Sequence, residues 1–123
     1  MARIFHVLLI EDDPMIVYAM TAGLAGAGHV VSSATSVEEG INALSRPDEY
    51  DVILLDIRLG PDRGEEIFTE LRKRGIDFAP VIVVSAQTEA EIQQAARAVP
   101  AVATLRKPIS LETLCETMER AVA

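Results

Sequence analysis

The chain has 123 residues, half of them hydrophobic, and a formal net charge of −8. This length fits one domain with a substantial core, and no hydrophobic block reaches the roughly 20 residues that are needed to cross a bilayer. The acidic balance argues against nucleic-acid binding by this chain, because proteins meet phosphate groups with lysine and arginine.

The N-terminal residues and the cysteine content favour a cytoplasmic protein without membrane contact. The opening residues, MARIFHVLLIEDD, contain no long apolar region followed by a small-residue cleavage site. Cys115 is the single cysteine of the sequence, so it cannot form a disulfide within the chain.

Short apolar segments rich in β-branched residues alternate with longer segments of helical periodicity. In chain order they predict a strand at 4–10, a helix at 14–27, a strand at 29–34, a helix at 37–45, a strand at 51–56, a helix at 65–74, a strand at 80–86, a helix at 89–98, a strand at 101–106 and a helix at 111–122. This alternation is typical of the α/β class, in which helices cover both faces of a parallel sheet. The most apolar segments, 52–55 and 81–84, are expected to be central strands, since such strands are buried on both faces.

Residue types at the segment ends support the predicted helices. Gly28 and Gly75 suit the ends of the first and third helices. Capping residues mark the helix starts: Asp13 before Pro14, Ser36 with Glu39, Thr88 with Glu91, and Ser110.

Polar side chains lie at the carboxyl ends of four predicted strands. Glu11 and Asp12 follow the first strand, Asp56 ends the third, Ser85 lies near the end of the fourth and Lys107 follows the fifth. Ligands of open α/β sheets bind at this edge, so we expect these groups to converge there. Closely spaced carboxylates repel one another and therefore take up protons or bind a cation, and oxygen ligands of this kind suit Mg²⁺. A metal held by Asp12 and Asp56, with the Lys107 ammonium group opposite, would prepare Asp56 to attack a phosphorus atom.

Four motifs, VLLIEDDP, VILLDIRLGPDRG, VIVVSA and LRKPI, closely resemble those of the receiver domain of two-component response regulators, in particular single-domain, chemotaxis-regulator-like receivers. The resemblance extends from about Ile4 to Val122 and includes the order and spacing of all five predicted strands. It implies a flavodoxin-like (βα)5 sandwich whose five-stranded parallel sheet has the order 2-1-3-4-5. It also implies that residues 1–123 form a single receiver domain, with no output domain in this chain.

The resemblance assigns a role to each site residue by its position. Asp56 matches the phosphoryl acceptor, which also contacts the metal. Asp12 would bind Mg²⁺ or Mn²⁺ directly, Glu11 would act mostly through water, and Arg58 would offer its backbone carbonyl. Ser85 matches the hydroxyl residue that bonds a phosphoryl oxygen after transfer.

Further matches lie directly after the fifth strand and in the loop after Asp56. Lys107 matches the family's lysine, and the Lys107–Pro108 peptide bond is usually cis in the family. Gly64 has its expected place.

The chain also departs from the family pattern at several positions. Thr104 stands where an aromatic switch residue is common, so the usual route to the surface of the fourth helix, fifth strand and fifth helix is in doubt. Arg58 replaces a small or neutral residue, and its side chain could reach over the site or point to solvent. Gly60 stands where the family has a proline, with Pro61 following. Gln87 could contact the water that hydrolyses the acyl phosphate, or it could be a solvated loop residue.

These assignments imply a signalling switch of a two-component system or phosphorelay. A histidine kinase or a histidine phosphotransfer domain would present phosphohistidine, and the domain itself would catalyse transfer to Asp56 and later autodephosphorylation. It would not be an enzyme in the ordinary sense. Phosphorylation would draw in Ser85 and Lys107 and shift a population between two conformations, which signal through protein–protein contacts to an unknown target.

Other interpretations remain open at this point. Thr104 and Arg58 motivate a degenerate receiver that docks partners without phosphorylation. A receiver cut from a longer protein is another alternative. A phosphohydrolase of the haloacid dehalogenase superfamily is disfavoured, because that family has an aspartate where this chain has Arg58.

Overall fold

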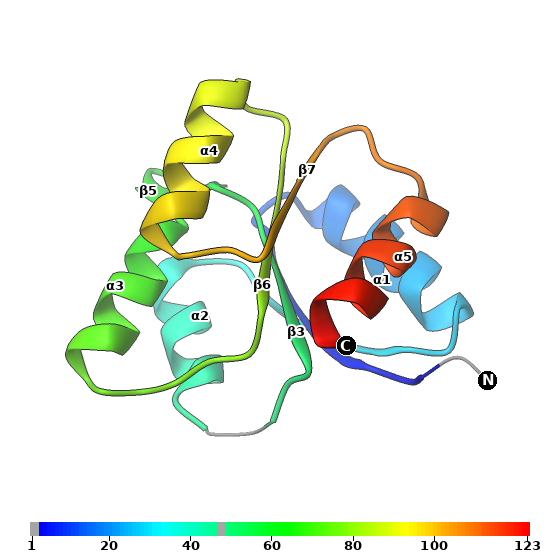
Figure 1. The fold of residues 1–123 in the computed structure, drawn as a ribbon, viewed down its shortest axis with the longest axis horizontal. Coiled ribbons are helices and arrows are strands. Elements are labelled where there is room, and N and C mark those ends of the chain that lie inside the picture. The colour runs from blue at the N-terminus through cyan, green and yellow to red at the C-terminus, as the bar shows by residue number, and fades with distance from the viewer. Residues whose placement is uncertain (1–2, 47–48) are drawn as a thin grey trace.

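The computed structural model describes residues 3–46 and 49–123, which form one layer of strands between two layers of helices (Figure 1). The central sheet has five parallel strands in the order β2-β1-β3-β6-β7. Its strands are β1 (His6–Ile10), β2 (Val30–Ala34), β3 (Val52–Leu55), β6 (Val81–Ser85) and β7 (Ala103–Arg106). Counted within the sheet alone, this is the expected order 2-1-3-4-5, and the flavodoxin-like fold is confirmed.

Five helices cover the two faces of this sheet. They are α1 (Pro14–Gly26), α2 (Val37–Leu44), α3 (Glu65–Lys73), α4 (Glu89–Ala98) and α5 (Leu111–Val122). In Figure 1, α1 and α5 lie on one side of the strands, and α2, α3 and α4 lie on the other. The predicted helices match these to within a residue or so at their ends.

The two faces of β1 bury different residues, as the alternation of side chains along a strand requires. Val7 and Leu9 belong to the core cluster that includes residues of α1 and α5, whereas Leu8 and Ile10 belong to the cluster under α2, α3 and α4. Every residue of β3 and of β6 is buried. The expectation that 52–55 and 81–84 are central strands is therefore confirmed.

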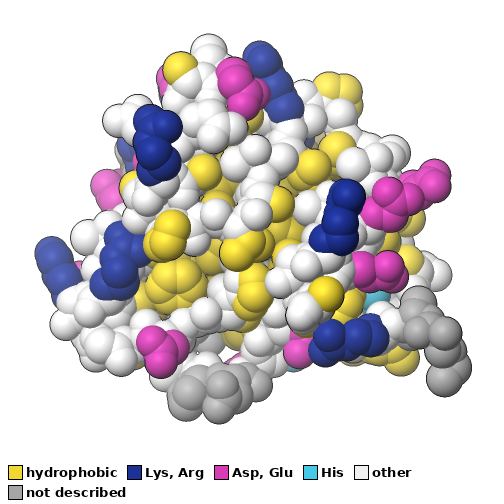
Figure 2. Space-filling view, in the orientation of Figure 1, with side chains coloured by type: hydrophobic (Ala, Val, Ile, Leu, Met, Phe, Trp, Pro, Cys, Tyr) yellow, Lys and Arg dark blue, Asp and Glu magenta, His cyan; other side chains and the backbone are white. Residues whose placement is uncertain are grey.

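The strand β7 lies at one edge of the sheet, between α4 and α5. Figure 2 views the molecule from this side and shows hydrophobic side chains gathered along the middle of the face. Val102, directly before β7, is one of the large hydrophobic residues that solvent reaches here, with 58% of its surface exposed.

Most helices begin and end as the sequence predicts. The capping acceptors are the side chains of Asp13, Ser36, Thr88 and Ser110. The capping box expected at Ser36 differs, because the Glu39 carboxylate accepts its hydrogen bonds from the N–H and hydroxyl of Thr35, at 2.9 and 3.0 Å. After α1 and α3 the chain turns at Gly28 and Gly75, whose φ angles of 99° and 68° favour glycine.

A short hairpin between β3 and α3 was not predicted. Its strands, β4 (Arg58–Leu59) and β5 (Asp62–Arg63), are antiparallel, and Gly60 and Pro61 form the turn between them. Strands of two residues are too short to produce an alternating pattern in the sequence, which is why the pattern gave no sign of them.

Within residues 3–46 and 49–123, none of the helices combines the length and the hydrophobicity that crossing a membrane requires.

Candidate functional site

Backbone hydrogen bonds at the carboxyl ends of the strands hold three of the expected residues in place. The N–H of Glu11 donates to Ala34 at 3.0 Å, and the N–H of Asp56 donates to Ile10 at 2.9 Å. The N–H of Lys107 donates to Ser85 at 2.9 Å. The parallel ladder therefore continues past the strands, which brings these side chains to one edge of the sheet.

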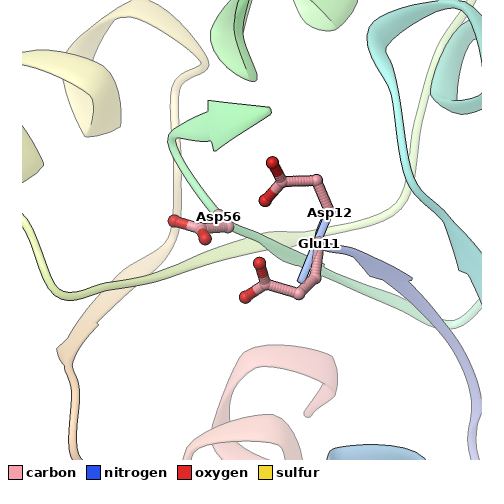
Figure 3. A group of neighbouring side chains, drawn as sticks. All are labelled: Glu11, Asp12 and Asp56. Atoms are coloured by element: carbon pink, nitrogen blue, oxygen red, sulfur yellow. The ribbon is translucent and has the colours of Figure 1, made fainter. Parts of the chain in front are cut away.

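Three carboxylates share a small space at this edge. One oxygen of each of Glu11, Asp12 and Asp56 lies within 4.8 Å of the others, and Figure 3 shows the three as neighbouring side chains. Only 1% of the Glu11 surface is exposed, Asp56 is half-buried, and Asp12 is exposed. The cluster is therefore closed by protein on the side of Glu11 and open to solvent on the side of Asp12.

The ammonium group of Lys107 bridges two of these acids. Its Nζ lies 2.5 Å from Glu11 Oε1 and 3.5 Å from Asp56 Oδ2. The side chains of Lys107, Glu11 and Asp56 are 16%, 2% and 14% exposed, so water screens this pairing only weakly. One ammonium group facing three carboxylates leaves an excess of negative charge, which favours a cation or an electrophilic phosphorus nearby.

Burial raises the pKa of Glu11 to about 7, and the charge of Asp56 adds to this rise. Hydrogen bonds from Lys107 and from the backbone N–H of Asp13 act in the opposite direction but do not cancel it. Near neutral pH the cluster therefore carries a partly protonated Glu11 as long as no cation is bound.

Gly64 packs closely against the backbone of Asp56. A Cβ atom at position 64 would lie 2.4 Å from the Asp56 carbonyl oxygen and 2.7 Å from Leu55 Cδ1, so a larger residue does not fit without a shift of the backbone. The N–H of Gly64 also donates to the Ile57 carbonyl at 2.6 Å. The sequence marked Gly64 only through the family resemblance, since a close approach of two backbone segments leaves no local pattern.

Ser85 lies at the same edge with a fully buried side chain. Its Oγ accepts a hydrogen bond from the Gln87 N–H at 3.2 Å, which leaves the hydroxyl proton available for a second partner. The Lys107–Pro108 peptide bond is cis, as the resemblance implies.

The Arg58 side chain extends from the β4–β5 hairpin toward α4. Its Nη2 is 3.9 Å from Glu91 Oε1, and 60% of the side chain is exposed. Of the two orientations left open, the structure thus shows the one toward solvent, with Glu91 as its neighbour. The expected capping box with Thr88 is half formed. The Thr88 hydroxyl accepts a hydrogen bond from the Glu91 N–H at 3.2 Å, while the Glu91 carboxylate faces Arg58.

Thr104 lies half-buried on β7. It lines two hollows, one between β7 and α4 and one between β7 and α5. The small Thr104 side chain fills neither hollow, and its part in switching stays a prediction.

The sequence did not predict that the hairpin contacts the acid cluster. The N–H of Gly60, in the turn of the β4–β5 hairpin, donates to Asp12 Oδ2 at 2.7 Å. The sequence signal that could have indicated this bond was Gly60 itself, which stands where the family has a proline. A proline has no N–H to donate, whereas a glycine has one.

Comparison with known proteins identifies the family. The family model described as the response regulator receiver domain matches residues 7–119. Protein PilH of Pseudomonas aeruginosa is 33% identical over 124 residues, which cover 100% of this chain and 99% of PilH. Other curated relatives are longer, and the chain spans about a quarter of the length of two transcriptional regulatory proteins of Escherichia coli.

Solved structures show the same fold. The chemotaxis protein CheY4 of Vibrio cholerae has a TM-score of 0.83 and 28% identity, with 97% of this chain and 99% of CheY4 covered. The receiver domain of the sensor histidine kinase PA1611 of Pseudomonas aeruginosa was solved with magnesium in its active-site cleft. It has a TM-score of 0.82 and 23% identity, with 98% of each chain covered. This chain therefore belongs to the response regulator receiver domains, which act in two-component signalling.

Proposed function

We propose that Asp56 accepts a phosphoryl group from a phosphohistidine, presented by a histidine kinase or a histidine phosphotransfer domain. The observation that carries this proposal is the cluster of three carboxylates bridged by Lys107 at the carboxyl edge of the sheet. Asp56 is the half-buried member, so an incoming group can reach its oxygens while protein shields the other side.

The residues of the cluster fit a hard divalent cation. Three carboxylates within 4.8 Å of one another, one of them open to solvent, form an oxygen donor set of the kind that Mg²⁺ or Mn²⁺ prefers. Asp12 and Asp56 would hold the ion directly, Glu11 would act through water, and Arg58 would contribute its backbone carbonyl. When bound, the ion would neutralise charge on the phosphoryl oxygens. The magnesium in the cleft of the PA1611 receiver domain supports this assignment by likeness of fold.

The chain's own groups account for the transfer. A carboxylate oxygen of Asp56 attacks the phosphorus atom and forms a P–O bond, while the P–N bond to the donor imidazole breaks and its electron pair returns to nitrogen. Lys107 is already 3.5 Å from Asp56 Oδ2 and offers positive charge to the phosphoryl oxygens. The free hydroxyl proton of Ser85 would then bond one of these oxygens. Attack of water on the same phosphorus, with Asp56 leaving, completes autodephosphorylation.

The phosphorylated state would signal through contacts with another protein. New bonds from the phosphoryl group to Ser85 and Lys107 favour one of two conformations and so shift their populations. The Lys107-bridged acids favour this switch over a docking module that needs no phosphorylation. A cytoplasmic location, where thiols stay reduced, fits the free thiol of Cys115.

Incubation with acetyl phosphate and Mg²⁺, followed by intact-mass spectrometry, tests the acceptor. We expect one phosphoryl group on the wild-type chain, none on Asp56→Asn, and none when EDTA removes the metal. Asp77→Asn is the matched control, because Asp77 is exposed and lies before β6, at the amino end of that strand. An adduct of equal yield in Asp56→Asn would contradict the assignment.

A further inference from the structure

The turn of the β4–β5 hairpin contacts the acid cluster through a single backbone group. The Gly60 N–H donates to Asp12 Oδ2 at 2.7 Å, across 48 residues of sequence. A short bond from a backbone N–H to an ionised carboxylate is among the stronger kinds of hydrogen bond in proteins.

Each acid of the cluster has a different restraint. Glu11 is buried and paired with Lys107, and Asp56 is half-buried and lies within 3.5 Å of the same ammonium group. Asp12 is exposed, and among the described residues its side chain has one hydrogen bond, the one from Gly60. Without that bond, the like charge of Asp56 and the freedom of an exposed side chain would both favour rotation of Asp12 away from the cluster.

The donor itself is held firmly. Leu59, the residue before Gly60, is 2% exposed and belongs to the core cluster under α2, α3 and α4. The hairpin strands pair Leu59 with Asp62 and Arg58 with Arg63. The Gly60 N–H is therefore presented from a turn anchored in the core, which is what a positioning group requires.

The backbone at position 60 restricts which residues can play this part. Gly60 has a φ of +59°, a value that proline cannot adopt and that most side chains disfavour. Nothing lies within 4 Å of a Cβ built there, so the restriction comes from the backbone conformation and not from crowding. Asparagine tolerates this conformation best among residues with side chains and keeps the N–H.

From these observations we infer that Gly60 is a positioning residue, whose backbone N–H holds Asp12 in the cluster so that the carboxylate is ready for a divalent cation. The inference rests on the proposed metal site and adds to it a specific contact that a proline at this position could not make. The hydrogen bond exists before the cation arrives and persists once it has bound.

Amide hydrogen exchange in the metal-free protein tests the bond. The Gly60 amide should exchange at least roughly tenfold more slowly than an unprotected glycine, and Asp12→Ala should abolish this protection. Asp13→Ala is the matched control, since Asp13 caps α1 through Met15 and should leave the Gly60 amide unchanged. Free exchange of Gly60 in the wild-type chain, or protection that survives Asp12→Ala, would overturn the inference. So would loss of protection on adding Mg²⁺, because the bond would then compete with the metal.

Titration calorimetry with Mg²⁺ tests the consequence. The double variant Gly60→Pro/Pro61→Gly lacks the N–H and should bind Mg²⁺ about tenfold more weakly, the lower end of the range for lost partners of metal ligands, because this bond is exposed to solvent. Gly60→Asn keeps the N–H and should bind within about twofold of wild type. Equal binding by the double variant would overturn the positioning role while the metal site stands. No Mg²⁺ binding by the wild-type chain would overturn the metal site and the positioning role together.

Discussion

Replacing Glu11 by glutamine tests the electrostatics of the acid cluster. Glutamine keeps an oxygen that can accept the hydrogen bond from Lys107, but it has no proton to titrate. Burial raises the pKa of Glu11 from 4.5 to about 7 in the folded chain. A shift of this size corresponds to about 3 kcal/mol, at about 1.4 kcal/mol for each pKa unit.

The direction of the effect follows from proton binding. Between pH 4.5 and about 7 the folded chain holds the Glu11 proton more tightly than the unfolded chain does. The stability that Glu11 contributes in the metal-free protein is therefore fully present below pH 4.5 and is lost as the pH rises through about 7. Glu11→Gln removes this dependence, so the variant should gain stability relative to wild type as the pH rises.

Urea unfolding followed by far-UV circular dichroism measures the effect in metal-free buffer, since the chain has no tryptophan for fluorescence. The free energy of unfolding of Glu11→Gln minus that of wild type should increase by about 3 kcal/mol from acid to neutral pH. Glu116→Gln, an exposed position on α5, should show a constant difference. A difference for Glu11→Gln that is equally constant would refute the argument that burial disfavours the ionised carboxylate.

Three further predictions concern packing and metal binding. Gly64→Ala should lower the free energy of unfolding by about 2–3 kcal/mol, because its Cβ would lie 2.4 Å from the Asp56 carbonyl oxygen. Gly26→Ala, where nothing lies within 4 Å, is the control, and equal urea midpoints for the two variants would contradict the close contact. Arg72→Met should lower the free energy of unfolding by about 1–2 kcal/mol, because the guanidinium group donates to two carbonyls at the C-terminal end of α4. Unchanged stability together with unchanged amide exchange in that turn would show that these bonds contribute nothing. Mg²⁺ affinity should rise between pH 5 and about 7, because binding releases the Glu11 proton. Calorimetry in two buffers of different ionisation enthalpy measures this release, and a pH-independent affinity without proton release would contradict the prediction.

Much of the fold could be predicted because the deciding signals are local. The segments 52–55 and 81–84 are apolar at every position, a pattern that is typical of strands buried on both faces. The caps at Ser36 and Ser110 mark helix starts through bonds that span three residues. The carboxyl ends of parallel strands meet at one edge, so the approach of Asp56 to Glu11 also followed from the order of the elements.

The details of the site depended on contacts between distant segments. The hairpin at 58–63 left no periodic signal, and its bond to Asp12 joins residues 48 positions apart. The direction of the Arg58 side chain was open until Glu91 on α4 was placed beside it. No local pattern indicates that Glu11 is buried or that Lys107 lies closer to Glu11 than to Asp56.

The amino-acid sequence by itself determined which elements form, in what order, and which end of the sheet carries the charged groups, because periodicity, capping and strand direction are properties of short segments. Only the tertiary structure decided how those charges are paired, which acid is buried and which backbone group holds the exposed one. Such choices depend on distances of a few ångströms between side chains far apart in the sequence, and these distances exist only once the core has packed.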